Sequence, residues 1–336
     1  MEGRVKVRIY QTKYQKKIAE FPSRFNYMKI AFQYGLLNSK EEQLSYYRTM
    51  MGEEGEQTVL EYLQKYGKNH WIVVLNLWQN YSGPLESDLI LFTKHKMYVF
   101  EIKNYLRTFS YEEGVCKING QIITTNPFHQ VRRSTVSLLN MCHHQGHSIE
   151  IQGAVIFAGA DNHIEIKSDI KDIDIIPRTK LLTYIEDIIH EENQHIERRI
   201  DTMNILGTLE NYETVDNYRP KPVSNEEVED IIKGISCEIC HVFDIKTRRY
   251  TVICNQCQHE ENRERAIVRA ICDYGVLRFD KELRMGSLFE FLEGQASKKL
   301  LRRILKKHFT TVSAGPNTYY LNKRQPFEKI ADQFEF

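Results

Sequence analysis

Three charged residues interrupt two apolar segments that otherwise have the pattern of buried β-strands. Asp88 opens the segment SDLILF, and Glu101 and Lys103 close the segment KMYVFEIK. Side chains alternate across a strand, so Glu101 and Lys103 project from the same face. The short connection TKHK predicts an antiparallel pair, in which the start of the first strand lies beside the end of the second. We therefore expect Asp88 to lie near Glu101 and Lys103.

These residue types suit one kind of chemistry. Two carboxylates that converge at a strand end repel each other unless a cation lies between them. Their oxygens suit Mg²⁺ or Mn²⁺, ions that promote attack of water on phosphate esters. The Lys103 ammonium would hold the attacking water or stabilise charge that develops on the phosphoryl group. The competing interpretation is a solvated sheet edge with a surface Glu–Lys ion pair, which such spacing often produces by chance.

The surrounding segments predict a mixed α/β domain that positions these residues. A helical pattern of apolar residues follows GEEGE at 52–56, and Gly67 is its expected end. Three β-rich segments follow: WIVVLNLW, SDLILF and KMYVFEI. A helix at 130–144, the buried strand IQGAVIFAG and the helix LLTYIEDII complete the unit. This order is typical of a β-sheet flanked by helices.

The ordered set GEEGE, SDLILF, FEIKNY and NPFHQVRR resembles the nuclease-related domain (NERD), a branch of the PD-(D/E)XK phosphodiesterase superfamily, over residues 50–190. The resemblance implies a mixed β-sheet flanked by helices and a metal-dependent deoxyribonuclease. It implies that Asp88 and Glu101 bind Mg²⁺ or Mn²⁺ and that Lys103 is catalytic. It also implies that Glu56 supports the metal site and that Gln130 orients the water or the DNA.

Two features near the motifs qualify the match. Pro84 does not directly precede Asp88, which departs from the pattern that names the superfamily. Glu53 and Glu86 are neighbouring competitors for the roles given to Glu56 and Asp88. We interpret both competitors as ordinary surface carboxylates, because exposed Asp and Glu are the rule.

Four of the seven cysteines form two CxxC pairs, Cys237-x-x-Cys240 and Cys254-x-x-Cys257. Each pair presents two thiolates to one ion, and four thiolates complete a tetrahedral Zn²⁺ shell. The segment resembles a zinc ribbon, with a structural zinc because a closed shell leaves no position for water.

Residues 264–324 resemble a winged helix more loosely: two helices, the basic helix SKKLLRRILKKHF, and a hairpin around Gly315-Pro316-Asn317. Basic side chains around an apolar stripe are a usual footprint for DNA. A solvated helix of a protein-interaction domain is the competing interpretation. The expected DNA-binding residues, on this helix and after the NPFHQ motif, are Lys298, Lys299, Arg302, Arg303, Lys306, Lys307, Arg132 and Arg133. Lys94, Lys96 and Arg107 are further candidates for phosphate contacts.

The composition and the distribution of charge indicate the class of protein and its partner. The 336 residues are 41% apolar and 27% charged, which is ordinary for a folded protein of two or three domains. Residues 231–336 hold 19 Lys/Arg against 13 Asp/Glu, whereas the rest holds 27 against 32, an asymmetry that favours a polyanionic partner for the C-terminal part. DNA is the expected partner, and RNA, a second copy of the chain and an activating protein stay open.

We predict five segments: a helical extension at 1–49, the nuclease-like domain at 50–190, a linker with a helix at 191–228, the ribbon at 229–262 and a basic domain at 263–336. The sequence has no leader-like N-terminus and no apolar run of about 20 residues, so we expect a cytoplasmic location and no membrane contact.

Overall fold

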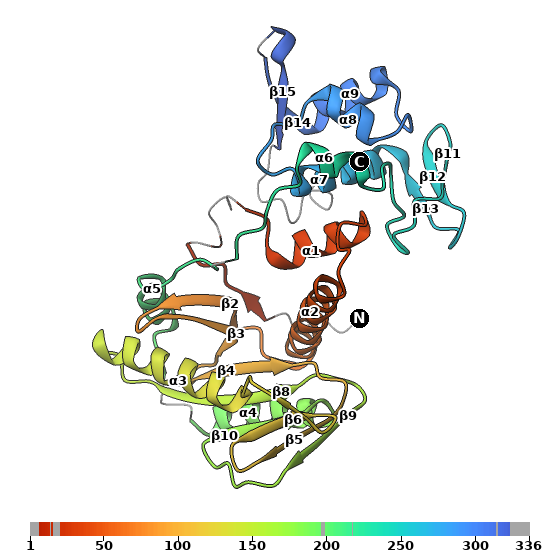
Figure 1. Cartoon of the computed structure of the whole chain (residues 1–336). Coiled ribbons are helices and arrows are strands. Elements are labelled where there is room, and N and C mark those ends of the chain that lie inside the picture. Colours follow the sequence, from red (N-terminus) through yellow and green to blue (C-terminus); the bar gives the residue numbers. More distant parts are fainter. Residues whose placement is uncertain are drawn as a thin grey trace, which may run out of the picture. The chain divides into compact units, whose positions relative to one another are not determined.

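A computed structural model describes residues 7–13, 15, 21–195, 199–216, 218–313 and 315–322. The described chain forms two compact units (Figure 1). The first contains residues 7–13, 15, 50–195 and 199–216, and the second contains residues 21–49, 218–313 and 315–322. The expected extension at 1–49 is thus divided between the units, and its residues 1–6, 14 and 16–20 lie outside the description, as do residues 323–336 of the basic domain.

The first unit is built on a six-stranded sheet in the order β1-β2-β3-β4-β8-β10. Its strands are β1 (Arg8–Ile9), β2 (Ile72–Asn80), β3 (Pro84–Phe92), β4 (Lys96–Lys103), β8 (Glu150–Phe157) and β10 (Ile173–Pro177). The antiparallel pairing of β3 with β4 that the sequence predicted is confirmed, and β2 is antiparallel to β3. The pairs β4–β8, β8–β10 and β1–β2 are parallel.

Helices cover both faces of this sheet, which explains why its central strands are apolar along their length. On one face α2 (Lys40–Tyr66) and α4 (Leu181–Gln194) pack Leu63 and Ile185 against Phe100. On the other face α3 (Pro127–His144) and α5 (Thr202–Glu210) contribute Val131 and Ile205 to a core around the other side of β3, β4 and β8. A short 3₁₀ turn, η1 (Arg178–Lys180), precedes α4.

A second sheet in the first unit has the order β7-β6-β5-β9. It consists of β5 (Arg107–Glu112), β6 (Val115–Ile118), β7 (Gln121–Ile123) and β9 (Asn162–Ile166). Phe109 on β5 is fully buried, with its ring centroid 4.9 Å from that of Phe157 on β8. The small sheet therefore extends the core that lies beneath α3.

The second unit has one apolar core around α7 (Arg263–Leu277), which is buried on most sides. Its other helices are α1 (Arg24–Gln33), α6 (Asn225–Asp230), α8 (Met285–Phe291) and α9 (Lys298–His308). The strands β11 (Ile245–Thr247), β12 (Thr251–Cys254) and β13 (Glu260–Asn262) form an antiparallel sheet. A hairpin of β14 (Phe309–Val312) and β15 (Tyr319–Asn322) follows α9, with the turn η2 (Gly315–Asn317) between its strands.

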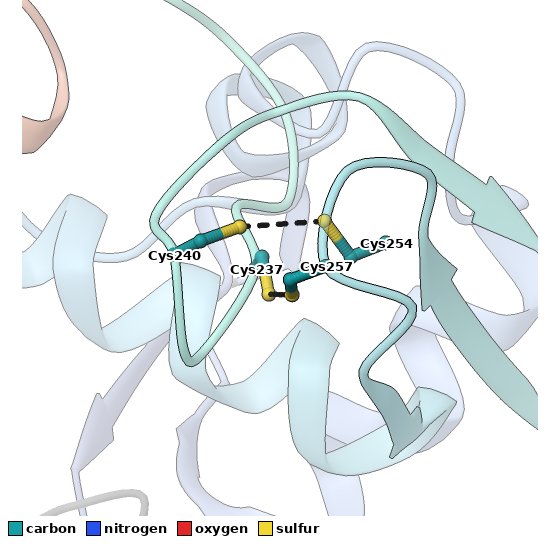
Figure 2. A group of neighbouring side chains, drawn as sticks. All are labelled: Cys237, Cys240, Cys254 and Cys257. Atoms are coloured by element: carbon teal, nitrogen blue, oxygen red, sulfur yellow. Dashed lines mark hydrogen bonds between the residues drawn. The ribbon is translucent and has the colours of Figure 1, made fainter.

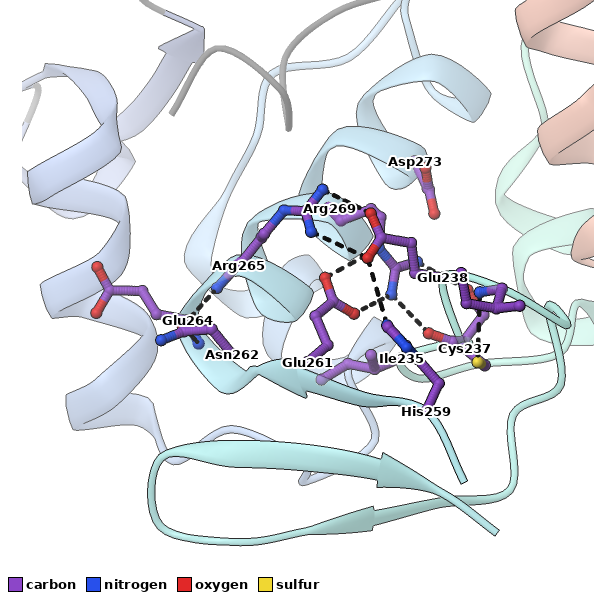
Figure 3. Close-up of polar contacts among 12 residues, drawn as sticks. Ile235, Cys237, Glu238, His259, Glu261, Asn262, Glu264, Arg265, Arg269 and Asp273 are labelled. Carbon is purple, nitrogen blue, oxygen red and sulfur yellow. Dashed lines mark hydrogen bonds and ion pairs between the residues drawn. The ribbon is translucent and has the colours of Figure 1, made fainter. Parts of the chain in front are cut away.

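Ion pairs connect the three-stranded sheet and its cysteine loops to α7 (Figure 3). The Arg269 guanidinium lies 2.8 Å from the Glu261 carboxylate, and both side chains are largely buried. Arg269 also donates a 2.7 Å hydrogen bond to the carbonyl of Ser236, next to the first cysteine. Arg265 pairs with Glu238 inside the first CxxC loop. These contacts make the cysteine loops and α7 parts of one folded unit.

Among the described helices, none combines the length and the apolar character that crossing a bilayer requires.

Candidate active site and four-cysteine centre

Asp88 and Glu101 face each other across the β3–β4 ladder. The register pairs Leu89 with Phe100, which sets Asp88 opposite Glu101 at the next position. Oδ2 of Asp88 accepts a 2.8 Å hydrogen bond from the backbone N–H of Ile102. Burial raises the pKa of Asp88, and Lys103 and the Ile102 N–H offset part of that rise. The charge of Asp88 also acts on Glu101, so the two carboxyl groups are electrostatic neighbours across the ladder.

Lys103 lies beside this pair. Its Nζ is 2.5 Å from Oε1 of Glu101. Burial alone would lower the pKa of Lys103, but Glu101 and Asp88 hold it above its ordinary value. Burial and the charge of Asp88 raise the pKa of Glu101 to about 7, although Lys103 acts in the opposite direction. The two carboxyl groups thus favour the charged form of Lys103 at the end of β4.

Glu56 reaches the site from α2 because of the glycine that precedes it. A Cβ at Gly55 would lie 2.9 Å from Cβ of Asn104, so only glycine lets α2 approach the end of β4 so closely. Asn104 also donates a 2.9 Å hydrogen bond to the carbonyl of Met51 on the same helix. Burial, followed by the charge of Asp88, raises the pKa of Glu56 to about 8. Glu56 is therefore an electrostatic neighbour of the strand carboxylates.

Glu86 belongs to the same cluster, and its interpretation as an ordinary surface carboxylate is wrong. It is half-buried on β3, two residues before Asp88 and therefore on the same face of the sheet. Burial, Asp88 and Asp216 raise its pKa to about 7, while a hydrogen bond from Trp78 acts to lower it. The sequence did contain a signal for this position, because residues two apart on a strand lie on the same face and Glu86 is two residues before Asp88. Glu53, by contrast, is exposed as expected.

Asn76 is a second residue that sequence reasoning missed. It has φ of 48° and interrupts the β2–β3 ladder between the pairs Leu75–Leu89 and Leu77–Ser87. The register puts it opposite Asp88, and its side chain hydrogen-bonds Glu56 and so acts to lower the pKa of that carboxyl. Asn76 is therefore a polar neighbour of the helix carboxyl.

The first residues of the NPFHQ motif form the start of α3, and their types suit that position. Asn126 is the N-cap, and its Oδ1 accepts hydrogen bonds from the N–H groups of Phe128 and His129 at 3.0 and 3.2 Å. Pro127 occupies the first helical turn, where its missing N–H costs nothing. Gln130 lies in that turn, and its buried Oε1 has no hydrogen-bond partner among the described residues. His129 is exposed.

This donor set fits a hard divalent cation. Four carboxyl groups with raised pKa values are opposed by Lys103, and the buried Oε1 atoms of Glu101 and Gln130 make no hydrogen bond of normal geometry within the described chain. Across that same part of the chain, no three carboxyl or histidine ligand atoms from different residues gather within 4.8 Å. An ion held by one or two carboxylates, which keeps several waters as Mg²⁺ commonly does, would need fewer protein ligands than such a cluster provides.

The basic residues expected to bind DNA differ in their surroundings. Arg132 makes a two-point contact with Asp172 at 2.6 and 2.9 Å, whereas Arg133 is exposed. Lys96 cannot serve as expected, because it is buried and paired with Glu150 and Glu191 at the opposite end of β4 from Glu101.

The basic residues of α9 are exposed, as the sequence predicted. Lys307 lies 2.6 Å and Arg303 lies 3.7 Å from the carboxylate of Glu264. Lys298 lies over the ring of Phe289 at 5.0 Å. Lys299, Arg302 and Lys306 have no carboxylate at ion-pair distance in the described part of the chain. The helix therefore presents a positively charged face.

The four cysteines of the two CxxC pairs converge on one point (Figure 2). Their sulfurs all lie within 4.8 Å of one another, with 3.5 Å between Cys237 and Cys257 and 3.4 Å between Cys240 and Cys254. A disulfide would need about 2.05 Å, whereas sulfurs about 2.3 Å from a tetrahedral zinc lie close to 3.8 Å apart. The cysteines share protons: the N–H of Cys257 and a hydrogen bond from Cys240 lower the pKa of Cys254 to about 7, whereas hydrogen bonds to the other cysteines help to raise the pKa of Cys240.

The two cysteine loops are copies of one backbone geometry. The carbonyl of Cys237 accepts a hydrogen bond from the N–H of His241, and that of Cys254 from the N–H of Gln258, at 3.1 and 3.0 Å. His241 and Gln258 have φ of 59° and 60°. Such equivalence is what two loops need if each is to give two sulfurs to a shared ion.

The family model of the nuclease-related domain (NERD) matches residues 51–158, which include Glu56, Asp88, Glu101, Lys103 and Gln130. No curated protein and no solved structure matches the chain. The chain thus contains a nuclease-related domain whose matched part ends with β8, while the first unit continues through β10, α4 and α5.

Proposed function

We propose that the protein is a metal-dependent nuclease that hydrolyses phosphodiester bonds of DNA. The observation that carries the proposal is the proximity of Asp88, Glu101 and Lys103, which lie at the far side of the β3–β4 hairpin from its connection, inside the nuclease-related domain. A domain that only binds DNA gains nothing from converging carboxylates, because they repel phosphates. Mg²⁺ or Mn²⁺ would reverse that repulsion.

Asp88 and Glu101 would hold the ion, and Glu56 and Glu86 would add negative charge around it. When bound, the ion supplies a charge that lowers the pKa of a water and stabilises the phosphoryl oxygens. Lys103, fixed by Glu101, would stabilise the charge that grows as the water oxygen bonds to phosphorus and the bond to the leaving ester oxygen breaks. Gln130 would orient the water or the DNA through its Oε1, which has no hydrogen-bond partner in the part of the chain that the structure describes.

We assign binding or selection of DNA to the second unit. Its helices α7, α8 and α9 precede the β14–β15 hairpin, and an isolated antiparallel bridge joins Leu283 to Tyr320. That order supports a winged-helix interpretation, with the exposed basic face of α9 toward phosphates. The cysteine centre would hold a structural Zn²⁺. We expect the enzyme in the cytoplasm, in defence against foreign DNA or in repair.

The test is cleavage of supercoiled plasmid and of linear single- and double-stranded DNA by the zinc-loaded protein with Mg²⁺, Mn²⁺ or EDTA. Metal-dependent products that disappear in both Asp88→Ala and Lys103→Ala are expected. Lys171→Ala is the matched control, because that lysine is 84% exposed in the same unit and outside the site. Absence of products with every metal, together with DNA affinity that is unchanged in Asp88→Ala, would instead support a non-cleaving regulator or scaffold.

A further inference from the structure

The turn between β11 and β12 carries an exposed tyrosine among arginines. Tyr250 is 67% exposed, and the guanidinium carbon of Arg249 lies 4.9 Å from the centroid of its ring. Arg248 and Lys246 are exposed beside it. Within the described chain none of these three cations has a carboxylate at ion-pair distance. The turn therefore presents an aromatic ring and uncompensated positive charge to solvent.

Arg263, the first residue of α7, fixes the backbone of this turn by hydrogen bonds. The N–H of Arg263 donates to the carbonyl of Tyr250 at 2.9 Å. The guanidinium of Arg263 donates to the carbonyl of Arg248 at 3.2 Å and to that of Gln295 at 2.7 Å. Because hydrogen bonds already fix the backbone at Tyr250, its exposed ring would lose little conformational freedom on binding a ligand. The position of Tyr250 is thus suited to binding.

The same contacts make the turn continuous with α9. Gln295 lies two residues before Ser297, which is the N-cap of α9, and Lys298 and Lys299 follow it. Arg263 therefore joins the turn to the loop that begins the basic helix. Positive charge from two elements far apart in the sequence lies on one stretch of surface, which matches the charge of a nucleic-acid backbone.

We propose that this surface, the Tyr250 turn together with the first turn of α9, binds single-stranded DNA, with Tyr250 stacking on an unpaired base. Arginines suit phosphates of any nucleic acid, but an exposed aromatic ring adds affinity only where a base is free to stack. A duplex keeps its bases stacked on each other, and an acidic peptide has no base to offer. The inference rests on DNA being the partner, and it does not require that the first unit cleaves it.

Binding is measured by fluorescence anisotropy with a labelled oligothymidylate and with a duplex of equal length, using the full zinc-loaded chain without Mg²⁺. Tyr250→Ala should weaken single-strand binding by roughly tenfold, the size of one base–aromatic stack, and leave duplex binding nearly unchanged. Arg248→Gln combined with Arg249→Gln should weaken binding of both DNAs and reduce the salt dependence of their affinity.

Tyr47→Ala and Arg48→Gln are the matched controls, because both residues are exposed in the same unit on α2. Neither should change affinity, and all variants should retain zinc. Equal loss of single-strand and duplex affinity in Tyr250→Ala, or no loss, would overturn the stacking proposal. That result is separable from the failure of the nuclease assignment, since cleavage is scored independently with Asp88→Ala.

Discussion

Nζ of Lys103 lies 2.5 Å from Oε1 of Glu101, and the two side chains retain only 18% and 4% of their exposure. This ion pair brings one positive charge into a set of four carboxyl groups. The carboxyls respond with raised pKa values, because burial and mutual repulsion both favour the neutral form. Negative charge accumulates in this set as the pH rises through those values, and a divalent cation would offset it.

The first prediction concerns pH and metal. The folded-state pKa values of about 7 for Glu86 and Glu101 and about 8 for Glu56 lie above the ordinary value. The folded state thus binds more protons than the unfolded state between about pH 4.5 and 8, so its stability falls as pH rises through that window. Thermal unfolding without Mg²⁺ should show a lower midpoint at about pH 8.5 than at about pH 5.5, and Mg²⁺ should restore it most at the higher pH.

Glu101→Gln is the control for this measurement. Its carboxamide keeps the shape of the side chain but removes the charge, so most of the Mg²⁺ effect should disappear. If Mg²⁺ stabilised this variant as much as the wild type, the ion would not be bound by Glu101.

The second prediction concerns Glu86, whose charge raises the pKa of Glu56 and of Glu101. If Glu86 acts through that charge, Glu86→Gln lets its neighbours ionise at lower pH. The pH at which Mg²⁺ stabilises half-maximally should then move down by less than about one unit. A loss of Mg²⁺ affinity that is the same at every pH would show instead that Glu86 is itself a ligand.

The third prediction separates two glycines of α2. Gly55→Ala should destabilise the first unit by about 1–3 kcal/mol and reduce cleavage, because its Cβ would meet Asn104 at 2.9 Å and displace Glu56. Gly52→Ala is the matched control, since its Cβ would meet nothing within 4 Å. It should stabilise the helix by about 0.5–1 kcal/mol. Chemical denaturation and plasmid cleavage measure both effects, and similar losses in the two variants would contradict the packing argument.

The fourth prediction concerns the cysteine centre. Metal analysis should find one zinc per chain in the wild type and a marked loss in Cys254→Ser. The second unit should unfold at lower temperature in that variant, because zinc binding contributes to folding. Cys142→Ser is the control, since Cys142 is buried in the first unit, away from the cluster. Full zinc content in Cys254→Ser would argue against a four-sulfur site.

Local patterns in the sequence were sufficient for the strands of the site. Alternation placed Glu101 and Lys103 on one face, and a short connection fixed the antiparallel partner of β4, so the approach of Asp88 followed. The spacing of the CxxC pairs likewise predicted the convergence of four sulfurs. In both cases the deciding contacts lie within about 20 residues of each other.

What the sequence did not reveal depends on contacts between distant segments. The burial of Glu86 and its repulsion by Asp216 come from segments more than 100 residues apart. Asp172 lies 40 residues from Arg132, and no local pattern announces their pairing. The strands β5 to β7 are short and carry polar residues, and α5 lies in a segment we interpreted as a linker. Its Ile205 and Leu209 are buried only because α3 is beside them.

The division of the chain has a consequence for its synthesis. Ile30 and Tyr34, at and just after α1, are buried in the core formed with α7 and α8. The ribosome makes α7 about 230 residues after α1, and at about 5–20 residues per second the interval is roughly 10–50 s. Most of the first unit is encoded between α1 and α7 and can fold during that interval. Until α7 and α8 have been made, the buried side chains of α1 lack their packing partners, so the first of the described helices depends on segments made much later.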